Sequence, residues 1–388
     1  MSRTVRHLGL HRINGTELQV LSEIETGTLP VIEAEEAVIR GYAEQGPWPH
    51  KSVSLFILQD LQPLIRQLRP GADLPPGGVA ALDSRPVVNA YDLADLSSCH
   101  VFLNWHMMQQ EKYSEDPEII QGLLAHEHAH PLAENATTRA SRRLQVQIAV
   151  EDWPSDSAVG RGLRTTPSPE EEAAVGAGYV APALQFGVSG GGGWLEEADH
   201  RERVDRLLGL MAETLCVYAP REVFASELAV RRGFGRPLLH LDQANVDNSL
   251  RSLAGREQVQ RHLQKERDAG RLSPAAARLL LLMGDLKGYV DLGLEVAAFL
   301  RAGREGQAQE LAEVLESDVF PHLEPQVPRL YAALRDHYVA LRDDLQPIEL
   351  LAWCQEVLTR FTDTLAEDGL KVRYALSMAE SHTRMAEN

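Results

Sequence analysis

The sequence predicts a mainly α-helical protein with a small β-sheet, that is, an α+β fold class. Hydrophobic residues make up 44% of the 388 residues and aromatic residues only 6%, which is typical of Leu- and Ala-rich helical proteins. Stripes of Leu, Val and Ala at helical spacing run through residues 248–388, and we expect a helical C-terminal subdomain there. The rest of the chain divides into an N-terminal α+β part, residues 1–95, and a middle region, residues 96–247.

The first hundred residues alternate helix-like and turn-like stretches. Glu33–Gln45 is acidic and helix-prone, and the apolar residues of Val53–Leu68 recur in an amphipathic helical pattern, so we expect a helix in each. Pro70–Gly78 is rich in Pro and Gly and predicts a turn region. The run Ser98–Trp105 predicts a β-strand, which is either an edge strand above a cleft or an ordinary core strand.

A further helix is indicated by local signals after this strand. Asp116 is a good N-cap, and Pro117 suits the first helical position because proline lacks the N–H that has no partner there. Apolar residues then recur at roughly helical spacing up to Ala125. Pro131 cannot continue a regular helix, so we expect the helix to bend or end shortly after His130.

This helix carries the pattern H-E-x-x-H of zinc peptidases, formed by His126, Glu127 and His130. Residues four apart share one face of a helix, so the two imidazoles can reach a single Zn²⁺ ion. A carboxylate beside such a site is the usual general base for hydrolysis, which makes Glu127 the expected catalytic residue. His128 points to a different side, and we expect it to face solvent or to support the ligands from outside.

A catalytic zinc ion needs a third protein ligand and an open position. The metzincin pattern is absent because the positions three and six residues after His130 hold Ala133 and Ala136. The best segment for the third ligand is Ala219–Ala229. Pro220 opens a helix expected over Pro220–Arg232, and Glu222 lies in its first turn. Three other carboxylates remain as rivals: Glu227, Glu213 and, if the helix continues past Pro131, Glu134.

The two segments His126-Glu127-x-x-His130 and Glu222-x-x-x-Ser226 resemble the gluzincin group of zincin metallopeptidases, in which a downstream helix supplies a glutamate ligand. The resemblance implies a zincin-like catalytic core with zinc bound by His126, His130 and Glu222. It also implies that the enzyme hydrolyses peptide bonds with Glu127 as base. Ser226 stands where these families usually carry the aspartate that orients a zinc histidine.

The segment between the two motifs contains a change in composition. Ala136–Glu151 predicts another helix, after which Pro, Gly and acidic residues indicate a mobile insertion near residues 153–195. Such an insertion is either a lid over the cleft or an inert surface loop. Tyr218, Arg236 and His240 are alternatives for the group that stabilises the oxyanion.

Beyond residue 248 we expect helices joined by short turns, at Ala275–Met283, Tyr289–Arg301, Gln307–Glu316, Val327–Asp343 and Pro347–Ala366.

Charge and cysteine content restrict the partners and the compartment. A formal charge of −18 without a basic patch argues against nucleic-acid binding. The sequence contains no apolar run of 18 residues, so we expect no membrane-spanning helix. Cys99, Cys216 and Cys354 are far apart and are expected to be buried, reduced thiols. The N-terminus lacks the apolar core of a signal peptide, which favours a cytoplasmic location. The partner is then a peptide or protein substrate; the alternative is a non-catalytic helical interaction protein with a vestigial or structural metal site.

Overall fold

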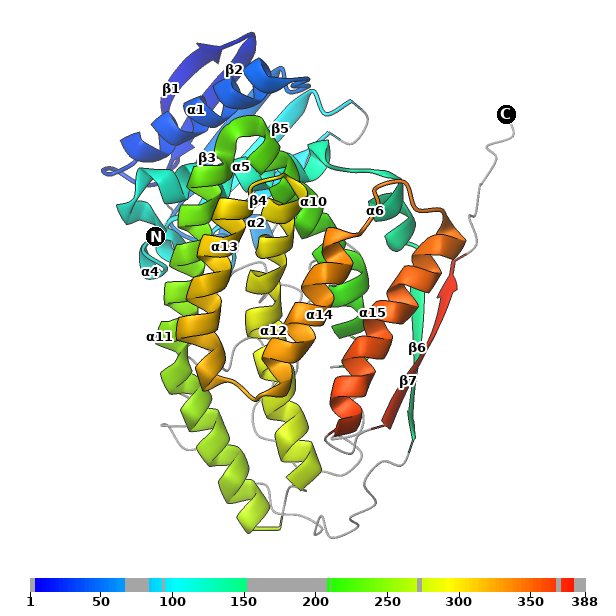
Figure 1. Ribbon diagram of the computed structural model, residues 1–388. Helices are drawn as coiled ribbons and strands as arrows, with labels where there is room; N and C mark the ends of the chain where they lie inside the picture. Colours follow the sequence, from blue (N-terminus) through cyan, green and yellow to red (C-terminus); the bar gives the residue numbers. More distant parts are fainter. Residues whose placement is uncertain are drawn as a thin grey trace. The chain divides into compact units, whose positions relative to one another are not determined.

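The computed structural model describes residues 4–66, 84–92, 95–151, 208–209, 211–270, 274–367 and 371–379. The described chain is mainly α-helical with two small sheets, which confirms the predicted α+β class (Figure 1). The principal elements are β1 (Arg6–Ile13), β2 (Thr16–Ser22), α1 (Leu29–Gln45), β3 (Ser52–Leu58), α2 (Gln62–Ile65), β4 (Val87–Tyr91), β5 (Ser98–Asn104), α4 (Trp105–Gln110), α5 (Pro117–Leu132), α6 (Ala136–Ser141), β6 (Leu144–Glu151), α10 (Ala219–Ala229), α11 (Gly235–Asp268), α12 (Pro274–Arg301), α13 (Glu305–Val314), α14 (Gln326–Val339), α15 (Pro347–Glu367) and β7 (Lys371–Met378).

The chain forms two compact units, each assembled from segments that are distant in sequence. Unit 1 comprises Met1–Ala133, Glu222–Ser252 and Glu295–Pro321. Unit 2 comprises Glu134–Arg221, Leu253–Leu294 and His322–Asn388. The long helices α11 and α12 therefore each contribute residues to both units. The predicted insertion near residues 153–195 lies outside the described residues.

Unit 1 contains a five-stranded mixed sheet with strand order β1-β2-β3-β5-β4. The three inner strands β2, β3 and β5 run parallel, and the two edge strands run antiparallel to their neighbours. Asn14 and Gly15 join β1 to β2 as a two-residue hairpin loop, in which both residues have positive φ. Helix α1 makes the crossover from β2 to β3 that a parallel pair requires. The helix predicted over Glu33–Gln45 is thus confirmed as α1.

The helix predicted over Val53–Leu68 is wrong. Its first part is strand β3, in which Val53, Leu55 and Ile57 are fully buried and alternate with partly exposed residues. A short apolar run of this kind is compatible with both a helix and a strand. It forms a strand here because it pairs with β2 on one side and with β5 on the other. Only Gln62–Ile65 of the predicted range is helical, and residues 67 and 68 lie outside the described part of the chain.

The strand predicted at Ser98–Trp105 is confirmed as β5, and it is a core strand. It lies between β3 and β4, and its residues Cys99, Val101 and Leu103 are buried. The edge on this side of the sheet is β4, which pairs antiparallel with β5 and packs against α5. The alternative in which Ser98–Trp105 forms an edge strand is therefore wrong.

Unit 2 combines helices with a two-stranded antiparallel sheet of β6 and β7 (Figure 1). The helix predicted over Ala136–Glu151 is wrong in its second part, because α6 ends at Ser141 and β6 follows. Pairing with β7, a strand that the sequence analysis did not predict, accounts for this difference. The helices predicted at Ala275–Met283 and Tyr289–Arg301 are one continuous helix, α12.

The other predicted C-terminal helices correspond to α13, α14 and α15. Among the described residues, no helix combines the length and the hydropathy needed to cross a membrane.

Candidate metal centre

Helix α5 begins and ends where the sequence predicts. Asp116 caps it, because its side chain accepts a hydrogen bond of 2.8 Å from the N–H of Glu118. Pro117 is the first helical residue, and Pro131 lies in the last turn before the helix ends at Leu132. The hydroxyl of Tyr42 on α1 donates a hydrogen bond of 2.7 Å to the carbonyl of Ala125 and so ties the middle of α5 to α1.

Glu222 on α10 meets the two histidines of α5. Its Oε2 atom lies 3.0 Å from Nε2 of His126 and 3.4 Å from Nε2 of His130. One ligand atom from each of the three residues lies within 4.8 Å of the other two. A tetrahedral zinc ion with bonds of about 2.0–2.1 Å holds its ligand atoms roughly 3.3 Å apart. The two carboxylate-to-imidazole distances match that spacing, so the donor set fits a metal ion.

Glu222 and His126 stabilise each other's charged forms. The charges and hydrogen bonds of the two imidazoles outweigh burial and hold the pKa of Glu222 well below its usual range. Burial disfavours the charged form of His126, but the hydrogen bond and the charge of Glu222 raise its pKa to about 9. The side chain of Glu222 is 38% exposed, so solvent reaches the site. A catalytic metal requires such an open side.

Ser226 contacts Nδ1 of His126, the ring nitrogen that does not face Glu222. Its Oγ atom is 2.9 Å from Nδ1 of His126, and it is also hydrogen-bonded to the carboxylate of Glu295 on α12. A carboxylate only accepts, so the serine hydroxyl donates to Glu295 and accepts from the Nδ1–H of His126. Without a metal, Nε2–H of His126 donates to Glu222. With a metal bound, the proton that Ser226 holds on Nδ1 would leave the lone pair of Nε2 for the ion.

Glu295 is accompanied by a second buried acid, Asp242 on α11. Burial and the neighbouring Glu295 raise the pKa of Asp242 well above its usual range, and burial also raises the pKa of Glu295. Oδ2 of Asp242 and Oε2 of Glu295 are buried and find no hydrogen-bond partner in the part of the chain that the structure describes. Two adjacent buried carboxyl groups cannot easily both be ionised, so Asp242 and Glu295 favour holding one proton between them.

The rival third ligands are engaged elsewhere. Glu227 forms ion pairs of 2.6 Å with Arg231 and 2.7 Å with Arg301.

Glu213 accepts a hydrogen bond of 3.2 Å from Tyr218, and Glu134 pairs with Arg142 at 2.8 Å. Of the carboxylates considered from the sequence, the structure brings Glu222 to His126 and His130.

Two of the residues considered for the oxyanion lie near the start of α5. Arg236 and His240 both contact the carboxylate of Glu118, at 3.1 Å and 3.0 Å. Glu127, the expected base, is partly exposed and makes no hydrogen bond or ion pair with the described residues. Its carboxylate is therefore not committed to a structural contact with the described part of the chain.

The expectation that His128 faces solvent is wrong. His128 is completely buried on the opposite side of α5, where its Nε2 lies 2.8 Å from the equally buried carboxylate of Glu35. Glu35, Asp242 and Glu295 are not among the site residues predicted from the sequence. Nothing in their local sequence separates them from the many other helix carboxylates of this chain.

The three cysteines are free and buried, as predicted. Comparison with protein-family models, with curated proteins and with solved structures finds no match to this chain.

Proposed function

We propose that this protein is a zinc-dependent peptidase of the zincin type, with the gluzincin ligand set His126, His130 and Glu222. The observation that carries the proposal is the approach of one carboxylate oxygen to Nε2 of both histidines, at 3.0 Å and 3.4 Å. When bound, Zn²⁺ lowers the pKa of water toward about 7 and polarises a carbonyl group.

The residues around the ligands have separate tasks in this proposal. Glu127 accepts the proton of the attacking water, a role that suits a carboxylate beside the ligands with no other partner among the described residues. Ser226 keeps the proton of His126 on Nδ1. Among the described residues β4 is the last strand on its side of the sheet, and it packs against α5. We propose that an extended peptide substrate adds to the sheet as a strand there.

The test combines metal analysis with a peptidase assay on three variants. The purified parent protein should contain about one zinc ion per chain at this site, Glu127→Gln should keep that zinc and lose turnover, and His126→Ala should lose it. His106→Ala, which changes an exposed histidine on α4, is the matched control and should change neither quantity. Retained turnover in Glu127→Gln would refute the base, and unchanged zinc in His126→Ala would refute the ligand.

A second candidate function is supported by the same ligand set. Two histidines and one carboxylate on one side of a metal also form the facial triad of non-haem iron(II) oxygenases. An iron-loaded protein that consumes dioxygen, with no peptide hydrolysis by the zinc form, would favour this candidate. Hydrolysis by the zinc form would favour the peptidase. A folded protein that binds neither zinc nor iron would favour the alternative that the chain is a non-catalytic interaction protein.

A further inference from the structure

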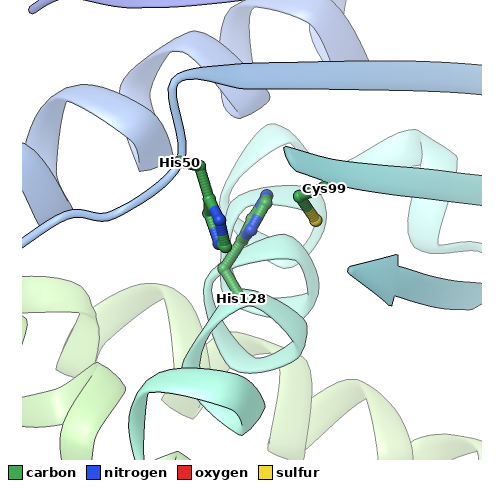
Figure 2. Close-up of side chains that lie close together, drawn as sticks. All are labelled: His50, Cys99 and His128. Atoms are coloured by element: carbon green, nitrogen blue, oxygen red, sulfur yellow. The ribbon is translucent and has the colours of Figure 1, made fainter. Parts of the chain in front are cut away.

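A second group of potential metal ligands lies on the opposite side of α5. Figure 2 shows the side chains of His50, Cys99 and His128 close together, each from a separate segment of unit 1. His50 precedes β3, Cys99 is in β5 and His128 is in α5. Their relative exposures are 2%, 1% and 0%, and one ligand atom of each lies within 4.8 Å of the other two.

Each imidazole of this group has one nitrogen fixed by a hydrogen bond and one that is not. Nδ1 of His50 lies 2.5 Å from the carbonyl oxygen of Leu96, which can only accept, so the proton of a neutral His50 is on Nδ1. Nε2 of His128 donates to Glu35 at 2.8 Å. Nε2 of His50 and Nδ1 of His128 are buried and have no hydrogen-bond partner of normal geometry among the described residues. The thiol of Cys99 is the polar group beside His128 and interacts with it.

This pattern is the one that metal-binding histidines show. Such histidines donate their other ring N–H to a backbone carbonyl or a carboxylate, which fixes both the tautomer and the ring orientation. His50 uses the first kind of acceptor and His128 the second. Buried polar atoms without a partner are rare in folded proteins, so two such nitrogens within 4.8 Å of one thiol need an explanation.

The surroundings hold the three side chains in place. The ring of Trp48 meets both imidazoles edge-on, with centroid distances of 4.6 Å to His50 and 5.3 Å to His128. Trp48 is fixed in turn, because its Nε1–H donates a hydrogen bond of 2.9 Å to the hydroxyl of Thr16. That hydroxyl donates to the backbone carbonyl of His50 at 2.8 Å. The ligand atoms therefore sit on a rigid aromatic support.

We propose that His50, Cys99 and His128 form a second, structural metal site that binds a thiophilic d¹⁰ cation, Zn²⁺ or Cu⁺. Thiolate and imidazole together select these ions over the hard cations Mg²⁺ and Ca²⁺. The thiolate of Cys99 and the adjacent carboxylate of Glu35 supply negative charge that offsets the charge of the cation. Because all three ligands are buried, the site serves the fold and does not meet substrate.

The site links α5 to two segments of the sheet region. His128 stands between His126 and His130 in sequence, so a metal bound to His128 also fixes the helix that carries the first site. Neutral imidazole is the metal-binding form, with Nε2 of His50 and Nδ1 of His128 as the ligand atoms. The competing arrangement has no metal and consists of a buried His128–Glu35 ion pair beside a neutral Cys99 thiol.

Cobalt(II) spectroscopy separates the two sites, because a thiolate ligand gives a near-ultraviolet charge-transfer band and the first site has no thiolate. Metal-free full-length protein titrated with Co²⁺ should develop this band with one equivalent bound at the second site. Cys99→Ala and His50→Ala should abolish the band, whereas His126→Ala should keep it. Cys354→Ser, which changes another free buried thiol, is the matched control and should also keep the band.

Displacement and stability complete the test. Loss of the band on adding Zn²⁺ identifies zinc as the preferred ion, and loss only on adding Cu⁺ identifies copper. The bound ion should raise the unfolding temperature of His126→Ala but not that of the double variant His126→Ala/Cys99→Ala. A folded parent protein that develops no thiolate band, or a band that survives Cys99→Ala, would overturn the proposal. The first of these results would leave the ion pair as the explanation.

Discussion

The hydroxyl of Ser226 lies 2.9 Å from Nδ1 of His126, on the side of the ring away from Glu222. Because the same hydroxyl is bonded to Glu295, the carboxylate that orients this histidine acts through a serine. In the gluzincin pattern an aspartate at the position of Ser226 makes this contact directly. Here the acid is supplied by α12, and the serine makes the connection.

The first prediction concerns this contact. Ser226→Ala removes the acceptor of the Nδ1 proton and should weaken zinc binding at the first site by about 10- to 100-fold. Glu295→Gln keeps the size of the side chain and should act in the same direction with a smaller effect. Zinc affinity is measured by competition with a chelator. Unchanged affinity in Ser226→Ala would show that the serine does not position the ligand.

The second prediction distinguishes the two glutamates of α10. Glu222→Gln should lose zinc and keep the fold, since its side chain is 38% exposed. Glu227→Gln should keep zinc but lose stability by about 1.5–3 kcal/mol, because it weakens hydrogen bonds to two arginines. Measuring the zinc content and the denaturant unfolding of both variants distinguishes the ligand from the structural glutamate. The reverse outcome would make Glu227 the third ligand.

The third prediction concerns pH and Asp242. Its raised pKa means that the folded protein holds a proton that the unfolded chain releases. This contribution to stability is present in full below the ordinary pKa of aspartate and is lost as the pH rises through the raised value. Asp242→Asn has no such proton, so its zinc-free form should lose less stability than the parent between about pH 5 and about pH 8. The measurement is thermal unfolding of both proteins at the two pH values. An equal loss of stability in Asp242→Asn and in the parent would contradict the prediction.

The fourth prediction concerns the close packing of α5 on α11. A Cβ atom at Gly122 would lie 2.3 Å from the carbonyl oxygen of Pro237, a backbone atom that cannot rotate away. Gly122→Ala should therefore destabilise the protein by about 1–3 kcal/mol. Gly306→Ala is the control, because a Cβ atom there meets nothing within 4 Å. Equal unfolding midpoints for the two variants would contradict this prediction, because α5 and α11 would then accommodate the added methyl group without loss of stability.

The HExxH helix could be predicted because its signals are local. Asp116 and Pro117 determine its start, Pro131 limits its length, and spacing alone places His126 and His130 on one face. Glu222 could be named only through the family resemblance, since 92 residues separate it from His130 (222 − 130) and many carboxylates lie closer in sequence. The structure supplies the spatial approach that the sequence leaves open.

Contacts between distant segments could not be predicted. Val53–Leu58 fits a helix and a strand equally well when read alone, and only its pairing with β2 and β5 decides. The same limit applies to His50 and Cys99, which are single residues in unrelated local patterns. Their approach to His128 depends on the register of β3 with β5 and on the packing of α5.

The division of unit 1 into three stretches of chain affects how the protein is made. Because a ribosome delivers the polypeptide from its amino end, the two histidines emerge well before Glu222, and Glu295 follows later still. A nascent chain therefore carries the imidazole pair without its acidic partner while the 92 residues from His130 to Glu222 are added (222 − 130). The proposed zinc site is therefore complete only after Glu222 has been synthesised, and its supporting acid Glu295 comes later still.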